Sequence, residues 1–336
     1  MNRAKLLRQK RTIDVKKESV FRTTLSLLNK KIHSRNDRNW LKYQGPYCPS
    51  LITYINNHKN SYDVFIFFTY LYYPSVEGIK IVGNKSIFIP TAHDEPEIYA
   101  PVYRSPFENA KFIMYNTESE KNFVQKLFTN ITNNHEIAGV GISLATKNNN
   151  LEISTSTEYH FNFKYILYMG RVDAAKGCSE LYKSFETYKE QHPLSKTKLV
   201  YLGQKIIDLP QTENIIFTGF VSESVKQLIL SNCEALIIPS HFESLSMVTL
   251  EAMYEKKIVI ANGECEVLKD HIIKSNSGFY YHNDKELFTV LTAISTLSRE
   301  EINQHGANAK KYVENNYTWE SILNKFDKAI DFIQKS

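Results

Sequence analysis

Short apolar runs of strand length recur along this chain, and segments with apolar residues at helical spacing lie between them. The runs that predict strands are residues 63–69, 85–90, 111–115, 136–142, 164–170, 198–203, 214–219, 234–239 and 257–261. Helices are predicted, among others, over residues 50–57, 118–128 and 245–256. Strands that alternate with helices at this spacing form parallel sheets covered by helices. The pattern therefore predicts an α/β fold.

The longest apolar run is residues 64–73 (VFIFFTYLYY), which ends at Pro74 and predicts a central strand. It is well short of the roughly 20 apolar residues that a membrane-spanning helix needs. Residues 1–17 are polar and basic, without the apolar core of a secretory signal. Four cysteines without metal-ligand or redox spacing, Cys48, Cys178, Cys233 and Cys265, predict free thiols in a reducing cytosol. We therefore expect a cytoplasmic protein.

A chain of 336 residues is too long for one ordinary domain and fits two. Residues 146–157 (TKNNNLEISTST) lack a sustained apolar period and predict a linker. We predict a first domain over residues 1–150 and a second over residues 158–316. Residues 317–336 form a separate closing segment, whose apolar residues have the spacing of a helix.

Positive charge is concentrated at the amino end. Residues 1–42 carry 13 Lys or Arg and 3 Asp or Glu, a local net charge of +10, whereas the rest of the chain has a net charge of −5. One interpretation is that this basic arm rests on an anionic membrane surface. The other is a solvated helix face beside a frayed terminus. Nucleic acid is not predicted as a partner, because no aromatic and basic interleaving accompanies the arm.

Two acids follow the predicted strand that ends near Pro239. Glu243 lies in the loop after this strand, and Glu251 lies two turns into the next predicted helix. Ligands bind in such loops of parallel α/β sheets, at the carboxyl ends of the strands. The spacing suits an extended ligand contacted at one end by Glu243 and at the other by Glu251. The alternative is a favourable helix-dipole partner and a solvated surface acid.

Two cations follow an earlier predicted strand that ends at Gly170. Arg171 and Lys176 lie in the turn between this strand and the next helix. A helix N-terminus offers free N–H groups and partial positive charge, and these side chains add hydrogen-bond donors suited to phosphate oxygens. The alternative is a pair of ordinary surface cations. Together with the acidic pair, Arg171 and Lys176 predict a site for a phosphorylated ligand.

His93 follows another predicted strand and is a candidate ligand contact. Asp94 could orient its imidazole or cap the next helix. The segment His93-Asp94-Glu95 is the nearest approach to a divalent metal site in the sequence, but Pro96 predicts a turn there. We therefore predict no metal ion.

The order of these motifs resembles that of the retaining glycosyltransferases of family 4, also called group 1. The matching elements are Gly170-Arg171, Lys176-Gly177, Gly219-Phe220-Val221, and Pro239-Ser240 with Glu243, Glu251, Ala252 and Met253. The resemblance covers roughly residues 40–334. The segment from Gly45-Pro46 through His93-Asp94-Glu95-Pro96 is similar to the N-terminal half of some bacterial members involved in surface polysaccharide assembly. It implies the GT-B fold, with two Rossmann-like domains whose parallel sheets face a central cleft, and a terminal helix that crosses back onto the first domain.

The resemblance also implies roles for particular residues. Arg171 and Lys176 would hold the donor diphosphate, Glu243 and His93 would face the donor sugar as catalytic candidates, and Glu251 would contact the ribose. The backbone at Leu245, Ser246 and Met247 would approach the sugar and phosphate, and Gly219 with Phe220 would lie near the nucleobase. Many relatives have glycine at the position of Ser246. The family's initial strand and glycine-rich turn have no counterpart before Trp40, so the first domain looks abbreviated.

The resemblance implies a retaining, metal-independent hexosyltransferase without a cofactor. It would move a sugar from a nucleotide-diphosphate donor to a hydroxyl of a glycan or lipid-linked glycan in polysaccharide biosynthesis, at the cytoplasmic membrane face if the basic arm binds lipid. The alternatives are an inactive or truncated homologue that binds nucleotide sugar as a subunit, and another GT-B enzyme such as a sugar-nucleotide epimerase.

Overall fold

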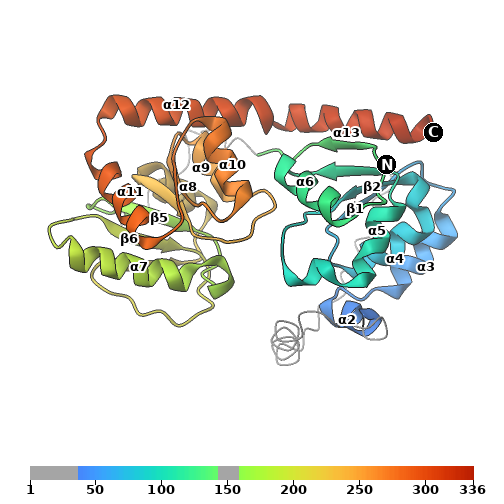
Figure 1. The fold of residues 1–336 in the computed structure, drawn as a ribbon, viewed down its shortest axis with the longest axis horizontal. Coiled ribbons are helices and arrows are strands. Elements are labelled where there is room, and N and C mark those ends of the chain that lie inside the picture. The colour runs from blue at the N-terminus through green and yellow to red at the C-terminus, as the bar shows by residue number, and fades with distance from the viewer. Residues whose placement is uncertain (1–36, 143–158) are drawn as a thin grey trace. The chain divides into compact units, whose positions relative to one another are not determined.

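The computed structural model describes residues 37–142 and 159–336, which form two compact units (Figure 1). The first unit contains the described residues up to Gly139 together with Leu323–Ser336, and the second contains those from Val140 to Ile322. The first unit ends before residue 150 because Val140 and Ile142 pack into the core of the second. The predicted linker at residues 146–157 and residues 1–36 of the basic arm lie outside the described residues.

The first unit contains a four-stranded parallel sheet in the order β1-β2-β3-β4. Its strands are β1 (Phe65–Phe68), β2 (Ser86–Ile89), β3 (Phe112–Tyr115) and β4 (His135–Ile137). The helices between the described strands and before them are α2 (Asp37–Gln44), α3 (Pro49–His58), α4 (Tyr73–Val82), α5 (Arg104–Asn109) and α6 (Glu118–Leu127). Helix α6 begins at Thr117, whose side chain accepts a hydrogen bond from the backbone N–H of Glu120.

The strand predicted over residues 63–69 is present as β1, but the prediction that it is a central strand was wrong. Strand β1 ends at Phe68, and it lies at one end of the sheet rather than in its middle. The chain turns at Thr69, where φ is +58°, and Tyr73 begins helix α4 with Pro74 in its first turn. Proline is well placed there because the first N–H groups of a helix have no intrahelical partner. Apolar content alone could not distinguish this strand, turn and helix start from one continuous strand.

Helix α13 (Trp319–Gln334) supplies one face of the first unit (Figure 1). Ala329 and Ile333 pack against strand residues Ile87 and Met114 in one buried cluster. The Lys325 ammonium donates a hydrogen bond to the carbonyl oxygen of Ile137 at the end of β4. The opposite face of the sheet is covered by helices that precede and follow β1, which bury an aromatic-rich cluster. The last residues of the chain thus complete the core of its first unit.

The second unit contains a six-stranded parallel sheet in the order β10-β9-β8-β5-β6-β7. Its strands are β5 (Tyr165–Met169), β6 (Lys198–Leu202), β7 (Ile215–Gly219), β8 (Ala235–Ile238), β9 (Ile258–Asn262) and β10 (Phe279–Tyr281). The first five agree with the predicted strands to within two residues at each end. The sixth was missed, because β10 is only three residues long and none of its side chains is fully buried.

Helices cover both faces of this second sheet. They are α7 (Cys178–Gln191), α8 (Glu223–Asn232), α9 (Met247–Tyr254), α10 (Glu266–Ser275), α11 (Asp284–Thr296) and α12 (Arg299–Asn316). Helices α7 and α11 pack on one face, where Phe185 and Leu291 contribute to the core. Helices α8, α9, α10 and α12 pack on the other, where Leu250 and Val313 contribute. Strands buried on both faces read as continuous apolar runs, which is why the sequence revealed them.

The fully buried position of Ala329 predicts how strongly α13 supports the first unit. We expect Ala329→Leu to lower the free energy of unfolding by about 1 to 3 kcal/mol, because extra methylenes would force Ile87 and Met114 apart. The matched control is Lys328→Leu, the same new side chain at the neighbouring exposed position. Urea denaturation of the full chain measures both, and equal stability of the two variants would contradict this packing.

Candidate functional site

The strand order of the second sheet reverses between β5 and β8. From β5 the chain continues outward through β6 and β7, whereas β8, β9 and β10 lie on the other side. The loops after β5 and β8 therefore leave the carboxyl edge of the sheet in opposite directions. Such a switch point opens a crevice between the two loops, where ligands of α/β sheets bind.

The loop after β5 is held against the loop after β8 by a glycine. Gly177 has φ +73°, and a Cβ atom added to it would lie 2.4 Å from the carbonyl oxygen of Pro239. Only glycine allows this approach without displacing one backbone from the other. Gly177 also directly precedes α7, so the N-terminus of a 14-residue helix opens at the switch point.

Lys176 and Glu243 meet at this point, one from each loop. The Lys176 Nζ atom lies 2.8 Å from Glu243 Oε1, and the two side chains are 35% and 16% exposed. The structure thus brings together a cation and an acid that are 67 positions apart in the sequence. Arg171 is placed differently: its guanidinium pairs with Asp173 at 3.0 Å, and its side chain is 59% exposed.

The loop from Glu243 leads into α9 through an unusual backbone turn. Ser246 has φ +63°, in the left-handed region that favours glycine. The Ser246 hydroxyl lies 2.9 Å from Thr249 Oγ1 and makes no cap bond to the helix. Helix α9 begins at Met247, two residues after the predicted start.

Glu251 lies on α9, as predicted, and pairs with a residue that the sequence did not single out. Lys226 of α8 reaches Glu251 Oε2 at 3.1 Å and also Glu223 at 2.8 Å. Burial lowers the pKa of Lys226, but the hydrogen bonds and negative charges of the two glutamates outweigh it, so its pKa is raised. Lys226 thus keeps its charge beside Glu251.

Gly219 is the last residue of β7 and Phe220 follows it, on the other side of β6 from β5. Gly219 has φ +70°, and an added Cβ atom would meet no other atom within 4 Å. Phe220 is 89% exposed. An exposed aromatic ring at the carboxyl end of a strand offers a surface on which a planar base could stack.

His93 lies in the first unit, after β2. Its Nε2 atom lies 3.2 Å from Glu95 Oε2. The adjacent residue Ala92 donates its N–H to the buried carboxylate of Glu120 at 2.6 Å, and Asn116 donates to the other oxygen at 2.5 Å. Burial raises the pKa of Glu120 to about 8, although these hydrogen bonds and the nearby His93 favour its ionised form. Glu120 therefore ties the loop that carries His93 to the end of β3.

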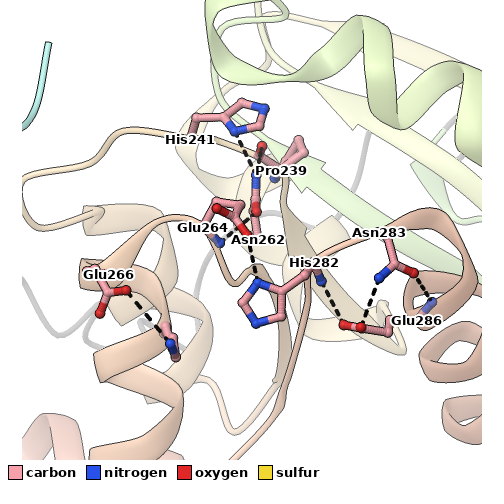
Figure 2. Close-up of polar contacts among 9 residues, drawn as sticks. Pro239, His241, Asn262, Glu264, Glu266, His282, Asn283 and Glu286 are labelled. Carbon is pink, nitrogen blue, oxygen red and sulfur yellow. Dashed lines mark hydrogen bonds and ion pairs between the residues drawn. The ribbon is translucent and has the colours of Figure 1, made fainter.

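The loop after β9 adds residues that the sequence analysis missed (Figure 2). Asn262 is 5% exposed, and its amide donates to the carbonyl oxygen of Pro239 at 3.1 Å and faces Nδ1 of His241 at 3.3 Å. The position of an asparagine at the end of a predicted strand was the available signal. No signal in the sequence connected it to His241, because the two lie on different loops.

A buried histidine supports the same site from behind. His271 of α10 contacts the carbonyl oxygen of Leu245 through Nε2 at 2.8 Å and the Tyr312 hydroxyl through Nδ1 at 2.9 Å. Nε2 must carry the proton, because a carbonyl oxygen can only accept. Burial lowers the pKa of His271 to about 4. The neutral ring therefore anchors the backbone between Glu243 and α9.

The described residues contain neither a cluster of metal ligands nor a membrane-spanning helix. Within residues 37–142 and 159–336, no three His, Cys, Asp or Glu side chains are grouped so that they could hold a metal ion. In the same ranges, no helix has the length and apolar character needed to cross a membrane.

Comparison with known proteins identifies the second unit. Residues 156–315 match the family model of the glycosyl transferases group 1. An uncharacterized glycosyltransferase of Methanocaldococcus jannaschii, MJ1607, is 26% identical over 251 residues, which are 68% of this chain and 62% of the relative. The alpha-1,3/1,6-mannosyltransferase ALG2 of Saccharomyces cerevisiae is 29% identical over 123 residues, 34% of this chain and 24% of the relative. Residues 156–315 are therefore similar to a group 1 glycosyltransferase domain, and the chain aligns with less than two thirds of either relative.

A solved structure supports the fold over a longer range. HepE of Anabaena, in complex with UDP-glucose, is similar with a TM-score of 0.66 and 13% identity, over 84% of this chain and 82% of that chain. The predicted fold is confirmed: two Rossmann-like units with parallel sheets, as in GT-B proteins.

The lowered pKa of His271 predicts how stability depends on pH. Between an unfolded pKa of about 6.5 and the folded value of about 4, only the unfolded chain binds this proton. The stabilisation from the neutral His271 ring is complete above pH 6.5 and is lost as the pH falls toward 4, by roughly 3 to 4 kcal/mol at about 1.4 kcal/mol per pKa unit.

His271→Gln should flatten this part of the pH profile, whereas the exposed control His160→Gln should leave it unchanged. Urea denaturation of the full chain at several pH values between 7 and 4 gives the comparison. A His271→Gln profile parallel to that of the unaltered chain would show that this histidine does not contribute.

Proposed function

We propose that this protein is a glycosyltransferase that moves a sugar from a nucleotide-diphosphate donor to a hydroxyl group. The observation that carries the proposal is the contact between Lys176 and Glu243 at the switch point of the second sheet. A cation, an acid and a helix N-terminus meet there, inside a domain that matches the group 1 glycosyltransferases. This combination suits a ligand that joins an anionic diphosphate to a sugar rich in hydroxyl groups.

The diphosphate would bind between the loops after β5 and β8. Lys176 would move from Glu243 to the phosphate oxygens, and the N-terminus of α7 would add its partial positive charge. Arg171 would add a second cation, because its exposed guanidinium is held only by the neighbouring Asp173. The backbone of Leu245, Ser246 and Met247 at the start of α9 would contribute further N–H groups.

Binding of the diphosphate would leave Glu243 as an acceptor for the hydroxyl groups of the sugar. Glu251, paired with Lys226, would accept hydrogen bonds from the ribose. Phe220, with Gly219 beside it, would contact the base. His93 stays a candidate sugar contact from the resemblance alone, and Glu120 ties down the loop that carries it.

The chemical step would break the bond between the anomeric carbon and the diphosphate and form a bond from that carbon to the acceptor oxygen, while the proton of the acceptor hydroxyl passes to the departing diphosphate. Negative charge would develop on the departing diphosphate. Lys176, Arg171 and the helix N-termini would stabilise that charge where it develops, which is the most effective form of transition-state stabilisation. We propose that transfer retains the anomeric configuration and needs neither a metal ion nor a cofactor.

The further features of the reaction are proposed from the same resemblance. The sugar would be a hexose, and the acceptor a glycan or a lipid-linked glycan in polysaccharide biosynthesis. The basic segment over residues 1–42 would bring the protein to an anionic membrane surface, on the cytoplasmic face where nucleotide sugars are made.

A variant of the central cation tests the diphosphate site. We expect Lys176→Met to weaken binding of the donor by about 1.5 to 3 kcal/mol, the range for a hydrogen bond to a charged group. The control is Lys183→Met on the exposed side of α7, which changes the net charge equally. Isothermal titration with the nucleotide sugar compares them, and equal affinity of the two variants would remove Lys176 from the site.

The proposed activity is tested with a panel of UDP, GDP and ADP sugars. The purified full chain should hydrolyse or transfer from one of these donors, with and without a chelator, and Glu243→Gln should lose turnover while retaining the nucleoside diphosphate. Saturable binding without turnover in the presence of glycan and lipid-linked acceptors would contradict an enzyme. Loss of turnover with the chelator would contradict metal independence.

A further inference from the structure

The side-chain amide of Asn262 has only one orientation that satisfies its neighbours. Its Nδ2 atom donates to the carbonyl oxygen of Pro239 at 3.1 Å, and its Oδ1 atom accepts from the backbone N–H of Glu264 at 3.0 Å. Both partners are backbone groups whose roles cannot change. A flipped amide would set oxygen against the Pro239 oxygen and NH2 against the Glu264 N–H. Because Asn262 is 5% exposed, water cannot easily replace either bond.

This fixed amide determines the protonation of a second side chain. Asn262 Nδ2 lies 3.3 Å from His241 Nδ1, and its remaining hydrogen points to that atom. His241 Nδ1 must therefore accept the hydrogen bond. A neutral imidazole that accepts at Nδ1 carries its proton on Nε2. His241 is exposed, and Figure 2 shows one ring nitrogen turned toward the Asn262 amide and the other turned away from it. Its Nε2–H group is therefore a hydrogen-bond donor that remains open to a ligand.

The Nε2–H group of His241 lies near the proposed diphosphate site. Pro239, which anchors Asn262, is the residue whose carbonyl oxygen lies against Gly177, next to Lys176. His241 itself lies two positions before Glu243, on the same loop. The loops after β5, β8 and β9 thus converge on one carbonyl group, and His241 extends from the middle loop at the carboxyl edge of the sheet.

We propose that His241 donates its Nε2–H to an oxygen of the donor diphosphate, and that Asn262 is the positioning residue that keeps the proton on Nε2. This inference rests on the proposed function, since it assigns a further contact in the same site. The contact adds a neutral hydrogen-bond donor beside the charged Lys176. It strengthens binding of a diphosphate without adding a positive charge that would slow release of the diphosphate product.

The protonation is tested without any ligand. Long-range proton–nitrogen correlation spectra of the full chain, with its histidines labelled with nitrogen-15, distinguish a protonated ring nitrogen from an unprotonated one. Comparison with His241→Gln assigns the signals. We expect the proton on Nε2 at neutral pH, and a mixture of the two tautomers in Asn262→Leu. A proton on Nδ1 in the unaltered chain would overturn the role of Asn262.

The ligand contact is tested by titration with UDP, GDP, ADP and inorganic pyrophosphate. We expect His241→Leu to weaken binding about tenfold or more, and His241→Gln, whose amide can place an N–H near the position of Nε2, to stay within about threefold of the unaltered chain. Asn262→Leu alone should weaken binding. Added to His241→Leu, it should have no further effect, because the two residues act through one hydrogen bond. Thermal unfolding confirms that each variant is folded.

Two outcomes separate this inference from the proposed function. If the unaltered chain binds these anions and Lys176→Met weakens binding while His241→Leu does not, the contact from His241 is wrong and the proposed site stands. If the unaltered chain binds none of them, both fall. Additive losses in the double variant would show that Asn262 acts on the loop as a whole rather than through His241.

Discussion

The contact between Gly177 and the carbonyl group of Pro239 is the constraint on which the candidate site depends. It holds the loop after β5 directly against the loop after β8, at the one place where the strand order of the second sheet reverses. Any side chain at position 177 would separate the two backbones. Because they meet, Lys176 and Glu243 can touch although each belongs to a different loop. The packing of the two backbones thus determines where the Lys176 and Glu243 side chains meet.

Buried polar groups fix the parts of the site that the ion pair does not reach. Asn262 satisfies two backbone groups and orients His241, while His271 holds the carbonyl oxygen of Leu245 from the opposite side. Both are buried, so each hydrogen bond has no competition from water and strongly favours one arrangement. A loop held in this way keeps its N–H groups in place for a ligand, which reduces the free energy that binding would otherwise spend on ordering it.

In the first unit, too, a buried polar side chain hydrogen-bonds backbone groups and holds loops in place. The Glu120 carboxylate bonds the backbone at Ala92 and Asn116, and so joins the ends of two neighbouring strands beside His93. Its raised pKa reflects the cost of burying that charge. The sheet itself depends on α13, which contains the last helical residues of the chain and covers Ile87 and Met114. The first unit therefore needs a segment far along the sequence to have a complete core.

The sequence alone determined the α/β class, the two units, nine of the ten strands in residues 37–142 and 159–336, and the identity of the charged residues near strand ends. It could do so because strands buried on both faces are continuous apolar runs, and because Lys176 and Glu243 follow two of them. Only the tertiary structure decided which of these residues meet. It paired Lys176 with Glu243 but Arg171 with Asp173, moved the end of β1 to Phe68, and brought Asn262 to His241. Such contacts depend on strand order and on backbone angles such as that of Gly177, and neither is encoded in the local pattern of apolar and polar residues.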